Sequence, residues 1–404
     1  MRVMVFLIFS LYISVFSAYG QVSKVALQIN DIAVSQSEFN FLLDEYVAAY
    51  KKVNGAQPPH DTLHLWKSNY IDRMLLIADA HDRLLVNKNV DVAVQVMSKY
   101  MIALPTSSFY LSKFGKAVSE QELLSAYEKR KIKYEIEYFQ FDNTDNLAEF
   151  FLVNGKDPFT NPSLKSSLKQ ITLIWPVSKF AFERIWNLKE GEVSHPINSR
   201  LGHYLLRVKA IKKNEQRAFD LEKDKISTTL KMHHQILANH RYVEELKRGI
   251  EFDTSSIKQL WADYSTGLLK KQSLLLGQED KLLTYWIGKE KFSVRLKDFL
   301  DYYNYLPIRQ KLNTLQHLYD FLISIVVTEE LYKEAVTSGF TKESDFLFRQ
   351  NRFRNKVILD QYYRSMAETM LKSNDTIKGI NPHFQKELIL KAKKKFKPII
   401  NFEF

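Results

Sequence analysis

The sequence predicts a mostly helical α+β protein of two or three domains, and three observations lead to that prediction. First, the 404 residues include only 12 Gly and 10 Pro, against average usages of about 7 % and 5 %. Second, several long segments repeat apolar residues at the three- and four-residue spacing of a helix. Third, two short segments, 134–141 and 203–212, alternate polar and apolar residues as strands do.

The first twenty residues are typical of a cleavable export signal. Arg2 gives a positive start, and Val3–Phe16 is an apolar run too short for a comfortable membrane span. Residues 18–20 (Ala-Tyr-Gly) fit the small-x-small cleavage rule and place the mature start at Gln21; the alternative is an uncleaved anchor. Because the chain has no Cys, disulfides and Cys-based metal sites are excluded. An exported protein without disulfides fits a bacterial periplasm.

Composition also excludes several classes of function. The chain has 58 Lys plus Arg against 46 Asp plus Glu, a formal charge of +12. Since export argues against nucleic acid as a partner, this charge favours acidic polypeptides or an anionic membrane surface. No two glycines lie closer than ten residues (Gly267 and Gly277), so phosphate-binding glycine loops are absent. We therefore expect no nucleotide, no other cofactor and no metal.

The N-terminal elements are predicted from capping and turn residues. Residues 25–34 form two short strands around an Asn30-Asp31 turn. Ser35 precedes an amphipathic helix, and Asp61 is expected to cap the next one, leaving His60 outside it. Further helices are predicted at 89–103 and 119–131.

Strands at 134–141 and 203–212, with a helix at 178–188, form a compact α+β segment in the middle of the chain. After it we predict a long helix at 220–249, a hairpin at 284–292, a helix from about 294, and helices at 314–337 and 342–371. The tail, Lys397–Phe404, resembles a strand and is hypothesised to join both hairpins.

A weak internal repeat links the two hairpins. Residues 34–39 (V-S-Q-S-E-F) resemble residues 294–299 (V-R-L-K-D-F), and each segment leads from a hairpin into an aromatic-rich helix. A Leu-x-x-x-Ala step comes later in each half, at Leu76 and at Leu331. The second hairpin loop is predicted to be two residues longer. The alternative is a chance similarity between two hairpin–helix units.

Three segments resemble the parvulin-type foldases of the bacterial envelope, the SurA/PrsA-like family of peptidyl-prolyl isomerases and chaperones. Residues 25–39 are similar to the family's V-N-G-x-x-I-[ST]-x-x-E-F opening, and residues 118–134 to the segment before its parvulin domain. Residues 188–208 (L-K-E-G-E-V-S-H-P-I-N-S-R-L-G-H-Y-L-L-R-V) carry the most specific match, including Pro196 and Gly202. The resemblance implies a helical chaperone-like module with an inserted parvulin-like domain.

Departures from the family's pattern fall on the residues that its catalysis uses. The paired histidines of active parvulins are missing: Tyr138 lies at the first position, and Tyr204 occupies the second, with His203 displaced by one place. One place along a strand is the opposite face, so His203 is no simple substitute. The family's G-G-x-L-G segment is also absent. We therefore expect a degenerate parvulin-like domain without isomerase activity.

The resemblance implies four divisions of the chain: a signal at 1–20, an N-terminal helical region at 21–130, the degenerate parvulin-like domain at 131–213, and a C-terminal helical region at 214–404. It also implies that the two helical regions pack together.

Other candidate sites are weighed against simpler explanations. His60 and His64 have the spacing of a metal pair but are expected to be a surface pair. Glu135 and Glu137 are expected to be exposed on one strand face rather than to form an acid/base pair. The basic run Lys391–Lys397 is more typical of a solvated helix end than of an anionic-surface contact. Tyr302, Tyr303 and Tyr305 are candidate client contacts, because aromatic rings give broad contact area at low entropy cost.

The function predicted from these features is an exported, ATP-independent chaperone for unfolded envelope or outer-membrane proteins. One alternative is an active peptidyl-prolyl isomerase that uses Tyr138, Tyr204 and Ser194 in place of histidines. A second alternative is a non-enzymatic subunit of an envelope or secretion complex, with one partner rather than many.

Overall fold

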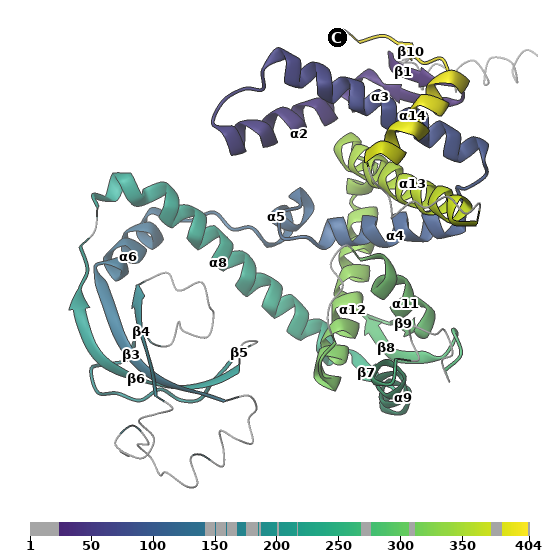
Figure 1. Cartoon of the computed structure of the whole chain (residues 1–404). Helices are drawn as coiled ribbons and strands as arrows, with labels where there is room; N and C mark the ends of the chain where they lie inside the picture. Colours follow the sequence, from purple (N-terminus) through teal and green to yellow (C-terminus); the bar gives the residue numbers. More distant parts are fainter. Residues whose placement is uncertain are drawn as a thin grey trace, which may run out of the picture. The chain divides into compact units, whose positions relative to one another are not determined.

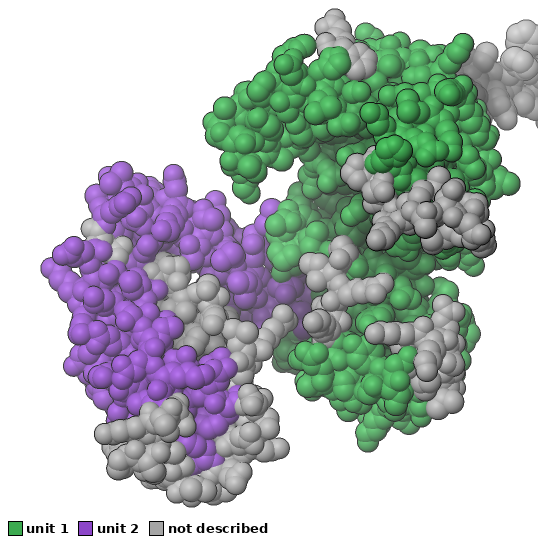
Figure 2. Space-filling model, viewed as in Figure 1, with its two compact units in different colours: residues 1–110, 244–404 green, residues 111–243 purple. Residues whose placement is uncertain are grey.

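The computed structural model describes residues 24–141, 150, 159, 168–174, 185, 187–199, 202–215, 217–267, 276–306, 312–372 and 382–402. They form two compact units: residues 1–110 with 244–404 (unit 1), and residues 111–243 (unit 2; Figure 2). The fold is α+β and mostly helical, as predicted. The predicted export signal lies outside the described residues. None of the described helices combines the length and apolar character that a membrane span needs.

The first lobe of unit 1 is built on a hairpin whose third strand comes from the other end of the chain. β1 (Val25–Ile29) and β2 (Ile32–Ser35) are joined by Asn30-Asp31, where Asn30 has a φ of 51°. This two-residue turn confirms the predicted hairpin. β10 (Ile399–Ile400) pairs antiparallel with β1, in the order β10-β1-β2. The tail strand therefore joins the first hairpin but not the second.

Helices from both ends of the chain enclose the core of this lobe. They are α2 (Gln36–Asn54), α3 (His60–Asp82), α4 (Lys88–Ala103), α13 (Ser344–Lys372) and α14 (Pro382–Lys395), with a short α5 (Ser108–Phe114) after α4. α3 packs against α13 and α14 (Figure 1). The expected cap at Asp61 is wrong: α3 begins at His60, after Pro59. Pro58 and Pro59 hold the chain extended up to His60, so the helix starts two residues earlier than a cap at Asp61 would place it.

The second lobe of unit 1 has the same plan. Its sheet is β7 (Ile250–Phe252), β8 (Lys281–Ile287) and β9 (Glu290–Arg295), and its helices are α9 (Thr254–Ser265), α11 (Leu296–Tyr305) and α12 (Leu315–Thr337), followed by the 3-10 turn η4 (Phe340–Lys342). The hairpin turn is Gly288-Lys289, with a φ of 59° at Gly288. The expected longer loop is therefore wrong, because Glu290 and Lys291 are already paired within β9.

In each lobe, a helix that follows the hairpin in sequence packs against the other lobe. α4, which comes after the first hairpin unit, packs against α11 and α12, while α13, which comes after the second, packs against α2 and α3. Val90 and Val94 of α4 lie in the first core and Val96 in the second. The two hydrophobic cores of unit 1 therefore share α4 as a common wall.

In its described residues, unit 2 combines the helices α6 and α8 with an antiparallel sheet in the order β4-β3-β6-β5. Its elements are α6 (Glu120–Arg130), β3 (Ile132–Phe141), β4 (Lys169–Ile174), β5 (Ile197–Ser199), β6 (Gly202–Lys213) and α8 (Phe219–Arg248), the last of which continues into unit 1. α6 starts with a capping box between Ser119 and Glu122. Leu123 of α6 packs against Ile226 and Leu230 of α8, so unit 2 extends beyond residues 131–213 on both sides.

Candidate functional site

The sheet of unit 2 brings Tyr138 and Tyr204 together on one face. Gln140 of β3 is opposite Tyr204 of β6, and Tyr138 is two residues away on the same face. Their ring centroids are 6.0 Å apart, with the rings tilted by 55°. Tyr204 is buried in the core of this face and Tyr138 is half-buried. The two tyrosines therefore pack as apolar rings at the positions where the resemblance places histidines.

Ser194 is bound to the backbone of β6. Ser194 is buried, its Oγ accepts a hydrogen bond from Leu206 N at 3.2 Å, and its own N–H donates to Leu206 O at 2.8 Å. The hydroxyl therefore extends the sheet ladder at the edge of β6. The backbone of His203 lies in β6, paired with Phe141 and Asn198, but its side chain is outside the described residues.

We expect Ser194→Ala to lower the free energy of unfolding of unit 2 by about 1–2 kcal/mol, since it leaves a buried N–H without its side-chain acceptor. Urea denaturation followed by circular dichroism measures this loss. The exposed Ser125→Ala change in α6 should alter the free energy of unfolding by no more than about 0.5 kcal/mol. Equal midpoints for wild type and Ser194→Ala would contradict the structural role of the hydroxyl.

Glu137 lies on the opposite face of this sheet and is bound by basic residues. Its carboxylate is 2.7 Å from Arg207 Nη2 and 3.4 Å from Lys209 Nζ, and only 6 % of the residue is exposed. Burial raises the pKa of Glu137, but hydrogen bonds from Arg207 and Lys209 outweigh it, so the net pKa lies below the ordinary value. The expectation that Glu137 is exposed is therefore wrong.

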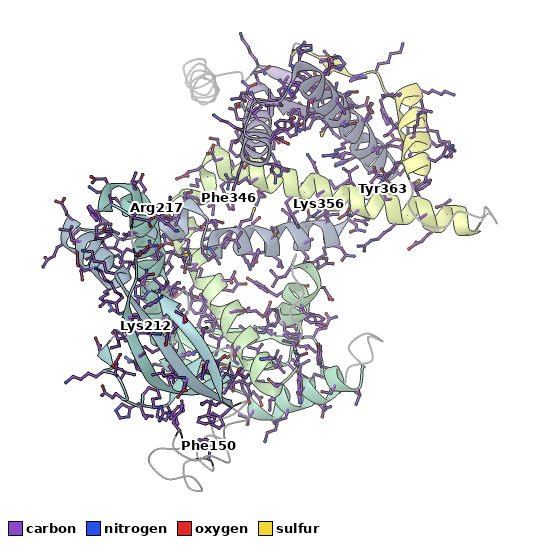
Figure 3. All side chains as sticks on the ribbon, turned by 60° about the vertical axis from the view of Figure 1, so that its left-hand side comes forward. Phe150, Lys212, Arg217, Phe346, Lys356 and Tyr363 are labelled. Carbon is purple, nitrogen blue, oxygen red and sulfur yellow. The ribbon has the colours of Figure 1, made fainter. Side chains whose placement is uncertain are left out.

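The same face carries aromatic rings and a second ion pair. Phe139 packs against Phe150 at 5.0 Å, and Lys212 binds Glu135 (Figure 3). A charged Glu137 on this face cannot act together with the Tyr138–Tyr204 pair on the other.

The tyrosines predicted to contact clients are mostly part of the second core. Tyr302 is only 3 % exposed, and its hydroxyl donates to Glu329 at 3.0 Å. Tyr303 stacks on Phe299 at 5.7 Å. Tyr305 is half-buried. Tyr302 therefore cannot offer its ring to a bound chain, because it lies on the inner face of α11.

A row of partly buried aromatic rings lies between α2 and α3. Tyr46 stacks on Trp66 at 5.4 Å, and Trp66 stacks on Tyr70 at 5.6 Å. Tyr50 extends the row at 6.3 Å from Tyr46, and Phe39 closes its inner end. We call Tyr46, Tyr50, Trp66 and Tyr70 the aromatic row. The helical spacing of positions 39, 43, 46 and 50 predicts that these residues share one face of α2. It does not show whether that face is partly or fully buried.

The basic run at the end of α14 serves mainly to attach this helix. Lys393 is 2.7 Å from Asp72, and Lys395 binds both Asp79 and Asp82 of α3. These carboxylates neutralise much of the run's charge. Among the described residues, His60, His64 and the other possible ligands form no group of three that could hold a metal ion.

No protein-family model matches the chain, and no curated protein matches it. Among solved structures, the chain is similar to a SurA-like chaperone of Campylobacter jejuni, at 15 % identity over 55 % of this chain and 96 % of the other, with a TM-score of 0.23. It is also similar to the peptidylprolyl isomerase PrsA of Bacillus cereus, at 16 % identity over 55 % and 90 %, with a TM-score of 0.21.

A third similar structure is the foldase PrsA of Streptococcus pneumoniae, at 12 % identity over 52 % of this chain and 87 % of the other, with a TM-score of 0.23. The chain thus resembles the SurA/PrsA-like foldases.

Proposed function

We propose that this protein is an exported chaperone that binds unfolded polypeptide without ATP. The observation that supports this most directly is the aromatic row, in which four large rings from α2 and α3 are only partly buried. Partly exposed rings of this kind bind apolar segments of many sequences, because they supply rigid contact area at low entropy cost. Val53 and Leu65, which are 82 % and 60 % exposed, add apolar surface on the same two helices.

The location and the clients belong to the same proposal. The apolar start of the chain supports export to a bacterial periplasm, where unfolded outer-membrane proteins are the expected clients. The net charge of +12 would attract acidic segments of those clients. A contact with an anionic membrane surface gains little support, since the lysines of α14 are engaged by carboxylates of α3.

The sheet of unit 2 is proposed to have no isomerase activity. Catalysis of prolyl rotation requires fixed polar groups beside the twisted amide in a dry pocket. Here Tyr138 and Tyr204 pack on each other, and Ser194 is bound to the backbone. A peptide-based isomerisation assay should therefore give the uncatalysed rate. Turnover that Tyr138→Ala abolishes would instead establish the enzyme alternative.

Suppression of aggregation tests the chaperone proposal. The wild-type chain should reduce light scattering from several unrelated denatured proteins, and the double change Tyr46→Ser with Tyr50→Ser should require about tenfold more protein for the same effect. Tyr100→Ser, at a partly buried tyrosine of α4 outside the aromatic row, is the control and should behave as wild type. Protection of one partner only would favour a dedicated subunit, and no protection at all would reject the proposal.

A further inference from the structure

The two lobes of unit 1 repeat each other in backbone detail. Leu27 pairs with Val34 in the first hairpin, as Leu283 pairs with Val294 in the second, and each ladder shifts register just before that leucine. The third strand binds at the same point of each hairpin: Asn401 N donates to Ala26 O at 2.8 Å, and Asp253 N donates to Leu282 O at 2.9 Å.

The repeat continues into the helices. Phe39 of α2 contacts Trp66 of α3 at 5.8 Å, and Phe299 of α11 contacts Phe321 of α12 at 5.6 Å. Trp66 and Phe321 lie equally far before the Leu-x-x-x-Ala steps at Leu76 and Leu331. α3 and α12 are therefore equivalent helices, residue by residue.

The repeats differ beyond the third strand. In the second lobe, β7 leads directly into α9, whose Ile257 and Leu260 are completely buried. Tyr264 of α9 lies 6.1 Å from Tyr303, and its hydroxyl accepts a hydrogen bond from Leu312 N at 3.3 Å. α9 thus packs along β8 and the N-terminal part of α12.

The equivalent position in the first lobe is held by no helix in the described part of the chain. After β10, Phe402 stacks on Phe39 at 4.0 Å and the chain is described no further. α14 binds farther along α3, at Asp72 and Asp79. α13 meets α2 at another face, through Glu45.

Burial reflects this difference. In the second lobe, the residues of α12 beneath this region are completely or almost completely buried: Leu318, Phe321, Leu322 and Ile325. Their equivalents on α3 are only partly buried: Leu63, Trp66, Lys67 and Tyr70. The first lobe therefore leaves partly exposed the region that is buried in the second lobe.

We infer that this face, formed by Leu43 and Tyr46 of α2 with Leu63 and Trp66 of α3, binds one amphipathic helix of a client polypeptide. The kind of helix that would bind there is indicated by α9, which lies at the equivalent position of the second lobe. α9 has apolar or aromatic residues at i, i+3, i+4 and i+7: Ile257, Leu260, Trp261 and Tyr264. This is the anchor pattern of a helix that binds in a groove. The inference rests on the proposed function and adds the conformation in which the aromatic row recognises a client.

The probe is a fluorescein-labelled peptide with the α9 sequence, residues 253–266, titrated with the full chain and followed by anisotropy. We expect saturable binding that Tyr46→Asp weakens at least about tenfold. Leu124→Asp, at a 46 % exposed leucine of unit 2, is the control and should leave the affinity unchanged. A peptide with Ile257→Ser and Leu260→Ser should bind at least about tenfold more weakly than the parent peptide.

Equal binding of the parent peptide to wild type and Tyr46→Asp would overturn the inference. So would a dimer in sedimentation that Tyr46→Asp dissociates, because a second copy would then cover the face. Suppression of aggregation without peptide binding would reject helix recognition while leaving the chaperone proposal standing. Peptide binding without suppression would reject the chaperone proposal and keep the helix site, with a dedicated partner as its occupant.

Discussion

Replacing Asp79 with alanine should lower the free energy of unfolding of unit 1 by about 2–4 kcal/mol, measured by urea denaturation. Asp79 is only 3 % exposed, and its carboxylate accepts hydrogen bonds from Tyr362 at 2.7 Å, Arg83 at 2.7 Å and Lys395 at 2.8 Å. Its loss leaves the buried Tyr362 hydroxyl unpaired and detaches α14 and α13 from α3 at one point. The side chains of Arg83 and Lys395 are 46 % and 41 % exposed. Water screens their charges, so the expected loss of stability is smaller than for a fully buried ion pair.

The exposed neighbour Asp82 provides the control. It also binds Lys395, but with 53 % of its side chain exposed, so Asp82→Ala should cost no more than about 1 kcal/mol. Similar losses for the two variants would show that surface charge, rather than the buried network, holds α14 in place.

The pH dependence of the Asp79 network has a definite sign. Burial raises the pKa of Asp79, but hydrogen bonds from Lys395, Tyr362 and Arg83 outweigh it and hold the pKa below its ordinary value of 3.8. The unfolded chain therefore binds this proton more readily, and the stabilisation is complete above about pH 5. It is lost as the pH falls through the folded pKa. The difference between wild type and Asp79→Asn should accordingly be largest at neutral pH and shrink below about pH 4.

Local signals in the sequence predicted the elements with strong turn and capping chemistry. The Asn30-Asp31 turn, the Ser35 cap and the Ser119 capping box all lie where their residue types indicated. The alternation at 134–141 predicted β3, and the tail predicted β10, although the tail pairs with the first hairpin and not with both as expected. Each of these features depends on neighbours within a few residues along the chain or on a simple period.

The site residues depended on contacts that no local pattern contains. Tyr302 is one residue from the half-buried Tyr303, yet the packing of α11 turns it into the core. Glu137 is buried because Arg207 of β6 lies directly opposite it. The lysines of α14 are bound by acidic residues more than 300 positions away in the chain. The sequence pattern showed that these residues were aromatic or charged, but not which side of an element would be covered.

The second large effect should separate the two repeats. Phe321→Ala removes an almost completely buried ring, 2 % exposed, and should cost about 3–5 kcal/mol of the free energy of unfolding. Trp66→Ala removes the larger ring at the equivalent position, but this ring is only partly buried, so we expect a smaller loss of about 1–2 kcal/mol. Urea denaturation of both variants, followed by far-UV circular dichroism, measures the contrast.

A smaller loss of stability for Trp66→Ala would mean that the Trp66 ring contributes less to folding and is accessible to a bound client. Trp66→Ala should therefore retain the fold and lose most of its suppression of aggregation, whereas Phe321→Ala should lose stability first. If the two variants unfold at the same urea concentration, Trp66 is an ordinary core residue. The aromatic row would then be covered in solution, and the surface proposed for client binding would not exist.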